Sequence, residues 1–315
     1  MNKILGHEHV QTTFAEAMQQ GRLHHAWLLY GVKGIGKFSL AEQLAALFLC
    51  EVPSQGQACG QCHHCAMLHA GAHPDFSKID LLYDQKKKKF NRDINIAQTR
   101  QALDFLALSG LKSKRRVLMI DDANLMNNQA ANALLKGLEE PTEGSLLLIV
   151  CHDLMRLPTT IRSRCMLQAC SPLNPQQMQN ALKEQGFDES LYPLAIELGQ
   201  GSLGSVAILQ EAKQAKALLA WQGLVEDFAR SDIGLIQQWL DNHVKYIPHD
   251  LIASIVLLAA QKQALKLTSW QQSDAMFTAM QAVAKWPREV LLHTLRPAPA
   301  LISYMLQLRI ALKLR

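Results

Sequence analysis

The stretch that most constrains the fold is a glycine loop at Gly31–Ser39, with the sequence GVKGIGKFS. A short apolar run at 26–30 precedes it and an Ala- and Leu-rich run at 40–49 follows, which predicts a strand, a turn and a helix. In such a P-loop, glycines let backbone N–H groups turn toward a phosphate and a lysine reaches its oxygens. A glycine turn that never meets phosphate is the alternative. The flanking strand and helix favour a phosphate loop, with the candidate residues Gly31, Gly34, Gly36 and Lys37.

The same loop departs from the usual pattern at one position. Mg²⁺ binding requires a Ser or Thr hydroxyl directly after the lysine, and Phe38 stands there instead. Ser39 comes one residue late, and one residue on a helix turns a side chain by about 100°. The loop is therefore predicted to form without making a good Mg-ATP site, and the sequence leaves open whether ATP or ADP binds weakly.

A second candidate element is the apolar run 116–120, which ends in Asp121 and Asp122. In P-loop ATPases the first acid of such a pair supports Mg²⁺, and the second, usually Glu, orients the attacking water. Asp122 is one methylene shorter than Glu, which weakens this site. The acids could equally cap the next helix, a common use of Asp.

Four of the seven cysteines lie within sixteen residues, with the spacing C-x8-C-x2-C-x2-C. Four thiolates on two short knuckles can close a tetrahedral shell, which suits structural Zn²⁺ better than catalysis. Disulfides are disfavoured in the cytosol, so a metal is the better interpretation than two bridges. The predicted ligands are Cys50, Cys59, Cys62 and Cys65, with His63, His64 and His69 as substitutes; Cys151, Cys165 and Cys170 are predicted to be buried free thiols.

Length and composition set broad limits. The 315 residues suggest two or three domains, and 49% hydrophobic with 19% charged residues is typical of a globular chain. The net charge of +5 permits nucleic-acid contact without requiring it. No apolar run reaches the roughly 18 residues that span a membrane, and the first ten residues have no signal core, so a cytoplasmic protein is expected.

Two further stretches are less specific. The lysine run 86–89 is predicted to be a solvated loop, with contact to DNA phosphate as the alternative. Residues 209–315 show a helical pattern that predicts an all-α bundle, broken at Pro248, Pro287, Pro297 and Pro299. Four tryptophans are expected in its core: Trp221, Trp239, Trp270 and Trp286.

Several motifs together resemble bacterial clamp-loader subunits of the AAA+ superfamily. They are LHHA at 23–26, the four cysteines, NALLK at 132–136, LEEP at 138–141 and SRC at 163–165, and the resemblance extends from about Leu23 to Gly204. The gamma/tau motor subunits of that family should carry Thr at Phe38, Glu at Asp122 and an arginine near Ser205. These departures favour a member that does not hydrolyse ATP.

The resemblance implies a role for each part of the chain. Residues 1–165 would form the AAA+ P-loop domain with a zinc module at 50–65, residues 166–208 a small helical lid, and residues 209–315 a collar that holds subunits together. Arg164, with Ser163 and Cys165 of its motif, would be an arginine finger offered to ATP on a neighbouring subunit, because a permanently charged guanidinium can stabilise the transferring phosphoryl group. A salt-bridged surface arginine is the alternative.

The implied function is that of a stator in the DNA polymerase III clamp loader, which places the sliding clamp on primed DNA. The implied partners are the gamma/tau and delta subunits, with the clamp and primer-template DNA in the complex, and no membrane. Two other hypotheses stay open from the residues: an active gamma/tau-type ATPase, in which Ser39 reaches the metal, and a zinc-dependent DNA-binding protein, favoured by the cysteines and the lysine run.

Overall fold

The computed structural model describes residues 4–85, 88–107, 115–293 and 295–313. The chain divides into two compact units. Unit 1 comprises Met1–Ala181 with Gln200–Ser205, and unit 2 comprises Leu182–Gly199 with Val206–Arg315. The segment 166–208 therefore contributes to both units.

Unit 1 is built on a five-stranded sheet in the order β2-β5-β6-β1-β7. All of its strand pairs are parallel. The strands are β1 (Ala26–Tyr30), β2 (Phe76–Ile79), β5 (Arg116–Ile120), β6 (Ser145–Cys151) and β7 (Met166–Ala169). The three inner strands are apolar runs because both of their faces are covered, as expected for a parallel sheet.

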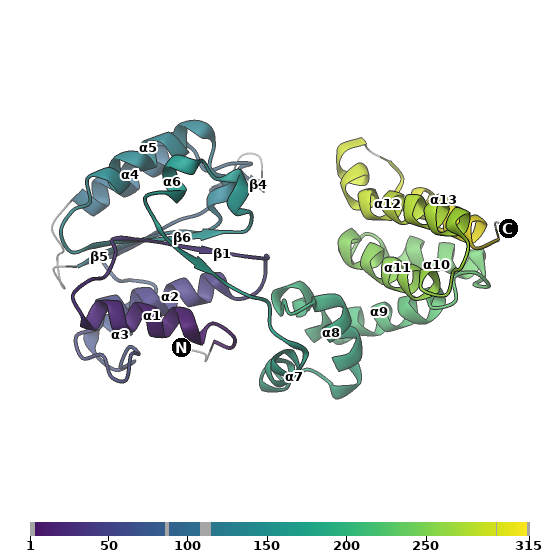
Figure 1. Cartoon of the computed structure of the whole chain (residues 1–315), viewed down its shortest axis with the longest axis horizontal. Helices are drawn as coiled ribbons and strands as arrows, with labels where there is room; N and C mark the ends of the chain where they lie inside the picture. The colour runs from purple at the N-terminus through teal and green to yellow at the C-terminus, as the bar shows by residue number, and fades with distance from the viewer. Residues whose placement is uncertain (1–3, 86–87, 108–114, 294, 314–315) are drawn as a thin grey trace. The chain divides into compact units, whose positions relative to one another are not determined.

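Helices cover both faces of this sheet (Figure 1). One face packs against α1 (Glu8–Gln19) and α2 (Lys37–Leu49), through a core that includes Phe14, Trp27 and Leu40. The other face packs against α4 (Ile96–Ala107) and α5 (Asn128–Glu139), through Leu28, Leu118 and Leu134. Successive residues of β1 point to opposite faces, so one five-residue strand contributes to both cores. The α/β prediction is confirmed.

Shorter elements complete unit 1. Between α2 and β2 lies α3 (His63–His69), and the antiparallel pair β3 (Tyr83–Asp84) and β4 (Lys89–Phe90) follows β2. Short helices η1 (Ala123–Leu125), η2 (Leu154–Arg156) and α6 (Thr159–Arg162) follow the carboxyl ends of β5 and β6. Lys86 and Lys87 of the lysine run lie outside the described residues.

Unit 2 is helical throughout its described part. The boundary between the units falls within α7 (Pro175–Glu184), and the first two residues of η4 (Gly204–Gln210) still belong to unit 1. The other helices of unit 2 are η3 (Glu189–Leu191), α8 (Tyr192–Gly199), α9 (Ala212–Val225), α10 (Ile233–His243), α11 (His249–Ala264), α12 (Trp270–His293) and α13 (Pro297–Lys313). Its core includes stacked Trp221 and Trp239, whose ring centroids lie 4.5 Å apart, and fully buried Trp286. The predicted all-α bundle is present.

Two details of that prediction are wrong. Trp270 is 81% exposed, because it opens α12 at the edge of the bundle instead of lying inside it. Pro287 does not end a helix, since α12 continues through it to His293. Proline in a helix interior costs about 3 kcal/mol, and the burial of neighbouring Val283 and Trp286 offsets that cost. Pro297 instead begins α13, a position where its missing N–H does no harm.

Within the part of the chain that the structure describes, no helix is both long enough and apolar enough to cross a membrane.

Candidate phosphate loop, arginine and metal site

The glycine loop lies between β1 and α2, as the sequence predicts. Gly31, Gly34 and Gly36 have φ values of 146°, 80° and 92°, a region that favours glycine. A Cβ at Gly31 would come within 2.3 Å of the Cys170 carbonyl oxygen, so a side chain has no room there. The backbone conformation therefore depends on these glycines, and α2 begins directly after Gly36 at Lys37.

Lys37 is turned into its own loop. Its Nζ donates hydrogen bonds to the carbonyl oxygens of Gly31, at 2.7 Å, and Val32, at 2.6 Å. The residue is only 2% exposed, and burial lowers the pKa of its ammonium. The Lys37 ammonium, which would contact a phosphate in a nucleotide-binding loop, is thus hydrogen-bonded to the backbone of the loop itself. Lys33 of the same loop is exposed.

A second segment of unit 1, Gln200–Ser205, packs on the loop. The N–H of Gly204 donates to the Gly34 carbonyl at 2.9 Å, and the Ser202 hydroxyl donates to the Lys33 carbonyl at 2.9 Å. A Cβ at Gly34 would approach the Ser202 Oγ to 2.4 Å. The loop is thus held from both sides, by Lys37 within and by this segment outside.

The residue at the hydroxyl position is packed as a hydrophobic side chain. Phe38 is partly buried against the core beneath α1 and α2, and the Lys78 Nζ lies 4.9 Å from its ring centroid. Ser39 follows it on α2 and is exposed.

The acid pair lies at the carboxyl end of β5. Asp122 adopts a left-handed conformation with φ 57°, and its side chain accepts from the Asn124 N–H at 3.2 Å, so it caps η1. Its Oδ2 also lies 3.5 Å from Nε2 of His152. The predicted capping alternative is therefore present. Asp121 is half-buried, and desolvation raises the pKa of its carboxyl group.

Asn124 lies beside the acid pair and is a candidate that no sequence pattern indicates. Its Oδ1 accepts from the backbone N–H groups of His152, at 2.8 Å, and Asp153, at 2.9 Å, and its Nδ2 donates to the Asp153 carbonyl at 2.8 Å. It thereby fixes the end of β6 beside the acid pair and positions His152 against Asp122. Burial lowers the pKa of His152, and the nearby positive charge of Lys37 is the second cause of this shift.

Arg164 lies apart from the glycine loop, after α6 and before β7. Its Nη2 lies 2.8 Å from the Glu139 Oε1 at the end of α5, and its Nη1 donates to the Thr160 carbonyl at 3.0 Å. The side chains of Arg164 and Glu139 are 36% and 50% exposed. In the single chain, Arg164 is a salt-bridged surface residue. Ser163 precedes it, and Cys165 is partly buried.

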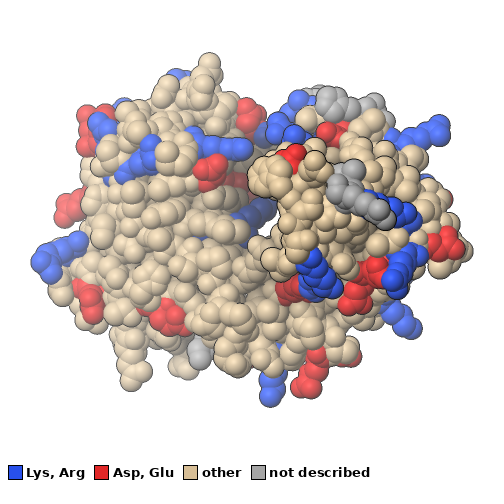
Figure 2. All heavy atoms as spheres, turned by 45° about the vertical axis from the view of Figure 1, so that its right-hand side comes forward, with Lys and Arg blue, Asp and Glu red and all other residues tan. Residues whose placement is uncertain are grey.

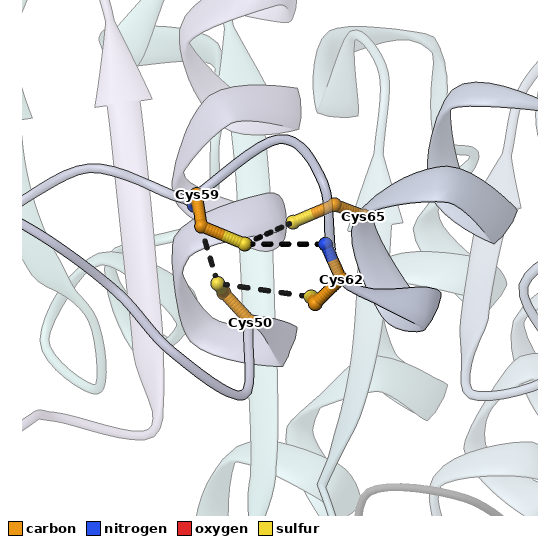
Figure 3. Close-up of side chains that lie close together, drawn as sticks. All are labelled: Cys50, Cys59, Cys62 and Cys65. Carbon is orange, nitrogen blue, oxygen red and sulfur yellow. Dashed lines mark hydrogen bonds between the residues drawn. The ribbon is translucent and has the colours of Figure 1, made fainter.

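The four predicted cysteines converge from the end of α2, the following loop and α3 (Figure 3). Their Sγ atoms all lie within 4.8 Å of one another, with Cys50 and Cys62 3.9 Å apart and Cys59 and Cys65 4.0 Å apart. A tetrahedral zinc with Zn–S bonds of about 2.3 Å requires sulfurs about 3.8 Å apart, so the donor set fits. Backbone N–H groups of Gln61 and Cys62 lower the pKa of Cys59 to about 6, whereas burial raises the pKa of Cys50 and of Cys65, so the fit to zinc rests on the placement of the four sulfurs.

The histidines proposed as substitute ligands are placed elsewhere. His64 is buried, with Nδ1 2.9 Å from the His73 Nε2 and Nε2 3.1 Å from the Glu51 Oε1. His63 and His69 are exposed on α3. Of the remaining cysteines, Cys151 and Cys170 are buried, and all three are free thiols.

The parallel sheet, the glycine loop between β1 and α2, and the helices on both faces are those of a P-loop α/β domain. Residues 6–174 match the family model described as DNA polymerase III, delta subunit, and the chain belongs to this family.

Relatives include both delta' and gamma/tau subunits. The chain is 42% identical over 146 residues to DNA polymerase III subunit delta' of Pseudomonas aeruginosa, which covers 46% of this chain and 43% of that protein. It is 30% identical to subunit delta' of Yersinia pestis, over 83% of this chain and 75% of that protein. It is 32% identical to subunit tau of Escherichia coli, over 64% of this chain and 31% of that protein.

A solved structure shares the fold. The gamma subunit-related protein of Thermotoga maritima superposes with a TM-score of 0.56 at 17% identity, covering 96% of this chain and 99% of that chain.

Proposed function

We propose that this chain is a delta'-type stator of the DNA polymerase III clamp loader, which does not hydrolyse ATP itself. The observation that carries the proposal is the interior of the glycine loop. Lys37 is hydrogen-bonded to the Gly31 and Val32 carbonyls, and Phe38 stands where a Mg²⁺-binding hydroxyl is needed. Asp122, which would have to orient water, is engaged with η1 and His152.

The proposed contribution to catalysis is made in trans. Arg164 is held at the surface by Glu139, so its guanidinium is ordered while remaining partly exposed. A neighbouring gamma/tau subunit would present ATP to it, and the guanidinium would exchange the carboxylate for the γ-phosphate. An arginine supplied in this way accelerates phosphoryl transfer by about 10³-fold or more in known systems.

The remaining parts of the proposal concern assembly. The four cysteines would hold a structural zinc that shapes the loop between α2 and α3, since their spacing fits a closed shell. Of the predicted lid at 166–208, β7 (Met166–Ala169) belongs to the sheet of unit 1, so the part after β7 would act as the lid. Unit 2 would supply the collar that contacts the gamma/tau and delta subunits. The assembled loader would bind the sliding clamp and primed DNA in the cytoplasm.

The test is the ATPase activity of the reconstituted loader with clamp and primed DNA. Loaders containing wild-type chain, Arg164→Ala or Arg162→Ala are compared, and the isolated chain is assayed beside them. Arg162 is the matched control because it lies two residues away and its Nη1 contacts the Met155 sulfur instead of a carboxylate. We expect a silent isolated chain, slowed turnover with Arg164→Ala, and normal turnover with Arg162→Ala.

Size-exclusion chromatography of each loader controls for assembly. ATP turnover by the isolated chain that disappears in Lys37→Ala would contradict the stator assignment and favour an active gamma/tau-type ATPase. Equal turnover by wild-type and Arg164→Ala loaders would remove the arginine-finger role.

A further inference from the structure

The β3–β4 hairpin has no role in the function proposed above. It follows β2 and precedes α4, and its register pairs Tyr83 with Phe90. The two rings meet edge to face, with centroids 5.2 Å apart and an interplanar angle of 74°. Cross-strand aromatic pairs stabilise two-stranded ribbons, so this contact explains why so short a hairpin forms.

The contact between the two rings stabilises the hairpin, but it does not explain why both rings remain largely exposed to solvent. Tyr83 is 52% exposed, Phe90 is 62% exposed, and Leu82 beside them is 52% exposed. Three large apolar side chains thus share one short ribbon and remain more than half open to solvent. Exposed apolar groups in a cluster mark a binding surface more often than isolated ones do.

The base of the hairpin is tied to the body of unit 1. The Asn91 N–H donates to the Leu82 carbonyl at 2.8 Å, and the Gln98 side chain, from α4, donates to the Asp80 carbonyl at 2.9 Å. Ile94, just after the hairpin, donates its N–H to the Leu125 carbonyl of η1 at 2.8 Å. The aromatic pair therefore lies near the carboxyl end of β2, on a hairpin whose base is hydrogen-bonded to α4 and whose following residues are hydrogen-bonded to η1.

The charge around the pair points to an anionic occupant. Lys88 and Arg92 are exposed and lie two residues before and two residues after Phe90, Lys88 in the turn that precedes β4 and Arg92 just beyond the strand. On the face seen in Figure 2, positive and negative side chains are interspersed. From Leu82 to Asp93 the sequence carries five Lys and Arg residues against two Asp residues, so this stretch is net basic.

We propose that Tyr83 and Phe90 form a stacking platform for unpaired bases of single-stranded DNA, with Lys88 and Arg92 facing its phosphates. Accessible aromatic faces beside cations are what sequence-independent single-strand binding requires, because every base has a π-face. Bases inside a duplex are already stacked on each other and cannot use such a platform. The site consists of hairpin residues alone, so it does not depend on the stator assignment or on Arg164.

The test is the affinity of the full-length chain for a fluorescein-labelled oligothymidylate, measured by anisotropy against a duplex of the same length. Wild-type chain is expected to bind the single strand more tightly than the duplex. Tyr83→Val and Phe90→Val keep β-branched side chains in the ribbon but remove the rings. Each is expected to weaken single-strand binding about 5- to 150-fold, the range found when a stacking ring is removed.

The charge contribution has a separate readout. Lys88→Ala with Arg92→Ala should lower the slope of log affinity against log salt by about 0.7 for each phosphate that is no longer neutralised. The matched aromatic control is Tyr246→Leu, because Tyr246 is 73% exposed in unit 2, away from the hairpin in sequence. This variant should bind as wild type does.

Hydrogen exchange at the Asn91 amide shows whether each variant retains the hairpin, since that N–H is bonded across its base. Three results overturn the proposal: no measurable single-strand binding by wild-type chain, equal or tighter binding of duplex, or unchanged affinity in ring-deleted variants. The last result is also expected if the platform instead contacts a protein, such as the clamp.

Discussion

At the scale of single residues, Lys37 has the identity of a phosphate-binding lysine but the contacts of a structural one. Its ammonium is buried and satisfied by two carbonyls of its own loop. Hydrogen bonds from a charged donor contribute more than neutral ones, and removing the donor takes this partner away from both carbonyls. The loop conformation should therefore depend on Lys37 without any nucleotide.

Replacing Lys37 by Met keeps the length of the side chain and removes the donor. We expect a loss of about 1–3 kcal/mol in the free energy of unfolding, because the Gly31 and Val32 carbonyls lose their partner. Urea denaturation followed by circular dichroism measures it.

Lys33→Met is the matched control for this substitution, since Lys33 is exposed in the same loop, and it should change stability by less than about 0.5 kcal/mol. Millimolar Mg-ADP or Mg-ATP should leave the melting temperature of wild-type chain unchanged. Strong stabilisation by nucleotide, lost in Lys37→Met, would show that the lysine binds phosphate.

At the scale of elements, the sequence predicts those features whose residues lie close together along the chain. The apolar run before Gly31 predicted β1, and the short spacing of Cys59, Cys62 and Cys65 predicted that their sulfurs converge. Asn124 could not be found in this way, because its partners at His152 and Asp153 lie 28 and 29 residues away. The Gly34–Gly204 contact spans a still longer separation.

Pro287 and Trp270 show the opposite failure, in which a local rule was overridden by packing. Proline predicts a helix break, yet Trp286 is buried in unit 2 and keeps this part of α12 in place. A tryptophan predicts burial, yet Trp270 stands at the first turn of its helix with most of its surface exposed. Tertiary contacts decided both outcomes.

The cysteine module is the element whose stability we expect to depend on metal. Cys62→Ser removes one thiolate of the proposed shell, so the purified variant should contain well under half of the zinc of wild type. Its melting temperature should fall by several degrees, because α3 and the loop before it are connected through these sulfurs. Elemental analysis and thermal melts measure the two effects.

His63→Ala is the control for the metal site, because His63 adjoins Cys62 in the sequence but is exposed and outside the four-sulfur cluster. It should retain full zinc content. Wild-type protein that holds no zinc when purified without chelator would refute the metal assignment.

At the scale of the whole molecule, unit 2 retains an apolar stripe that its own fold does not cover. Trp270, Phe277 and Leu291 are 81%, 61% and 81% exposed, and Ala284 between them is also exposed. These four residues recur every seven positions, so they return to nearly one face of α12. A face of this kind suits the packing of a helix from another subunit.

The double variant Phe277→Ser, Leu291→Ser should therefore enter the reconstituted loader less efficiently than wild type. Its unfolding free energy should change by less than about 1 kcal/mol in total, because both side chains are largely exposed in the single chain. Gel filtration of the mixed subunits measures incorporation. Leu235→Ser, on α10, is the control, and equal incorporation of all three proteins would exclude this stripe as a subunit contact.

The ion pair between Arg164 and Glu139 has a consequence for the speed of assembly. A half-exposed pair of this kind contributes about 0–1 kcal/mol after screening by solvent, so it is easily exchanged. A free arginine side chain, by contrast, carries about 2 kcal/mol of rotamer entropy. Part of that freedom is lost before any neighbour docks, because Glu139 and the Thr160 carbonyl already orient the guanidinium. In the proposed role, the Arg164 side chain would contact the γ-phosphate of the neighbouring subunit without first having to find the right rotamer. The rate at which this contact forms would then be set by how fast the two subunits associate.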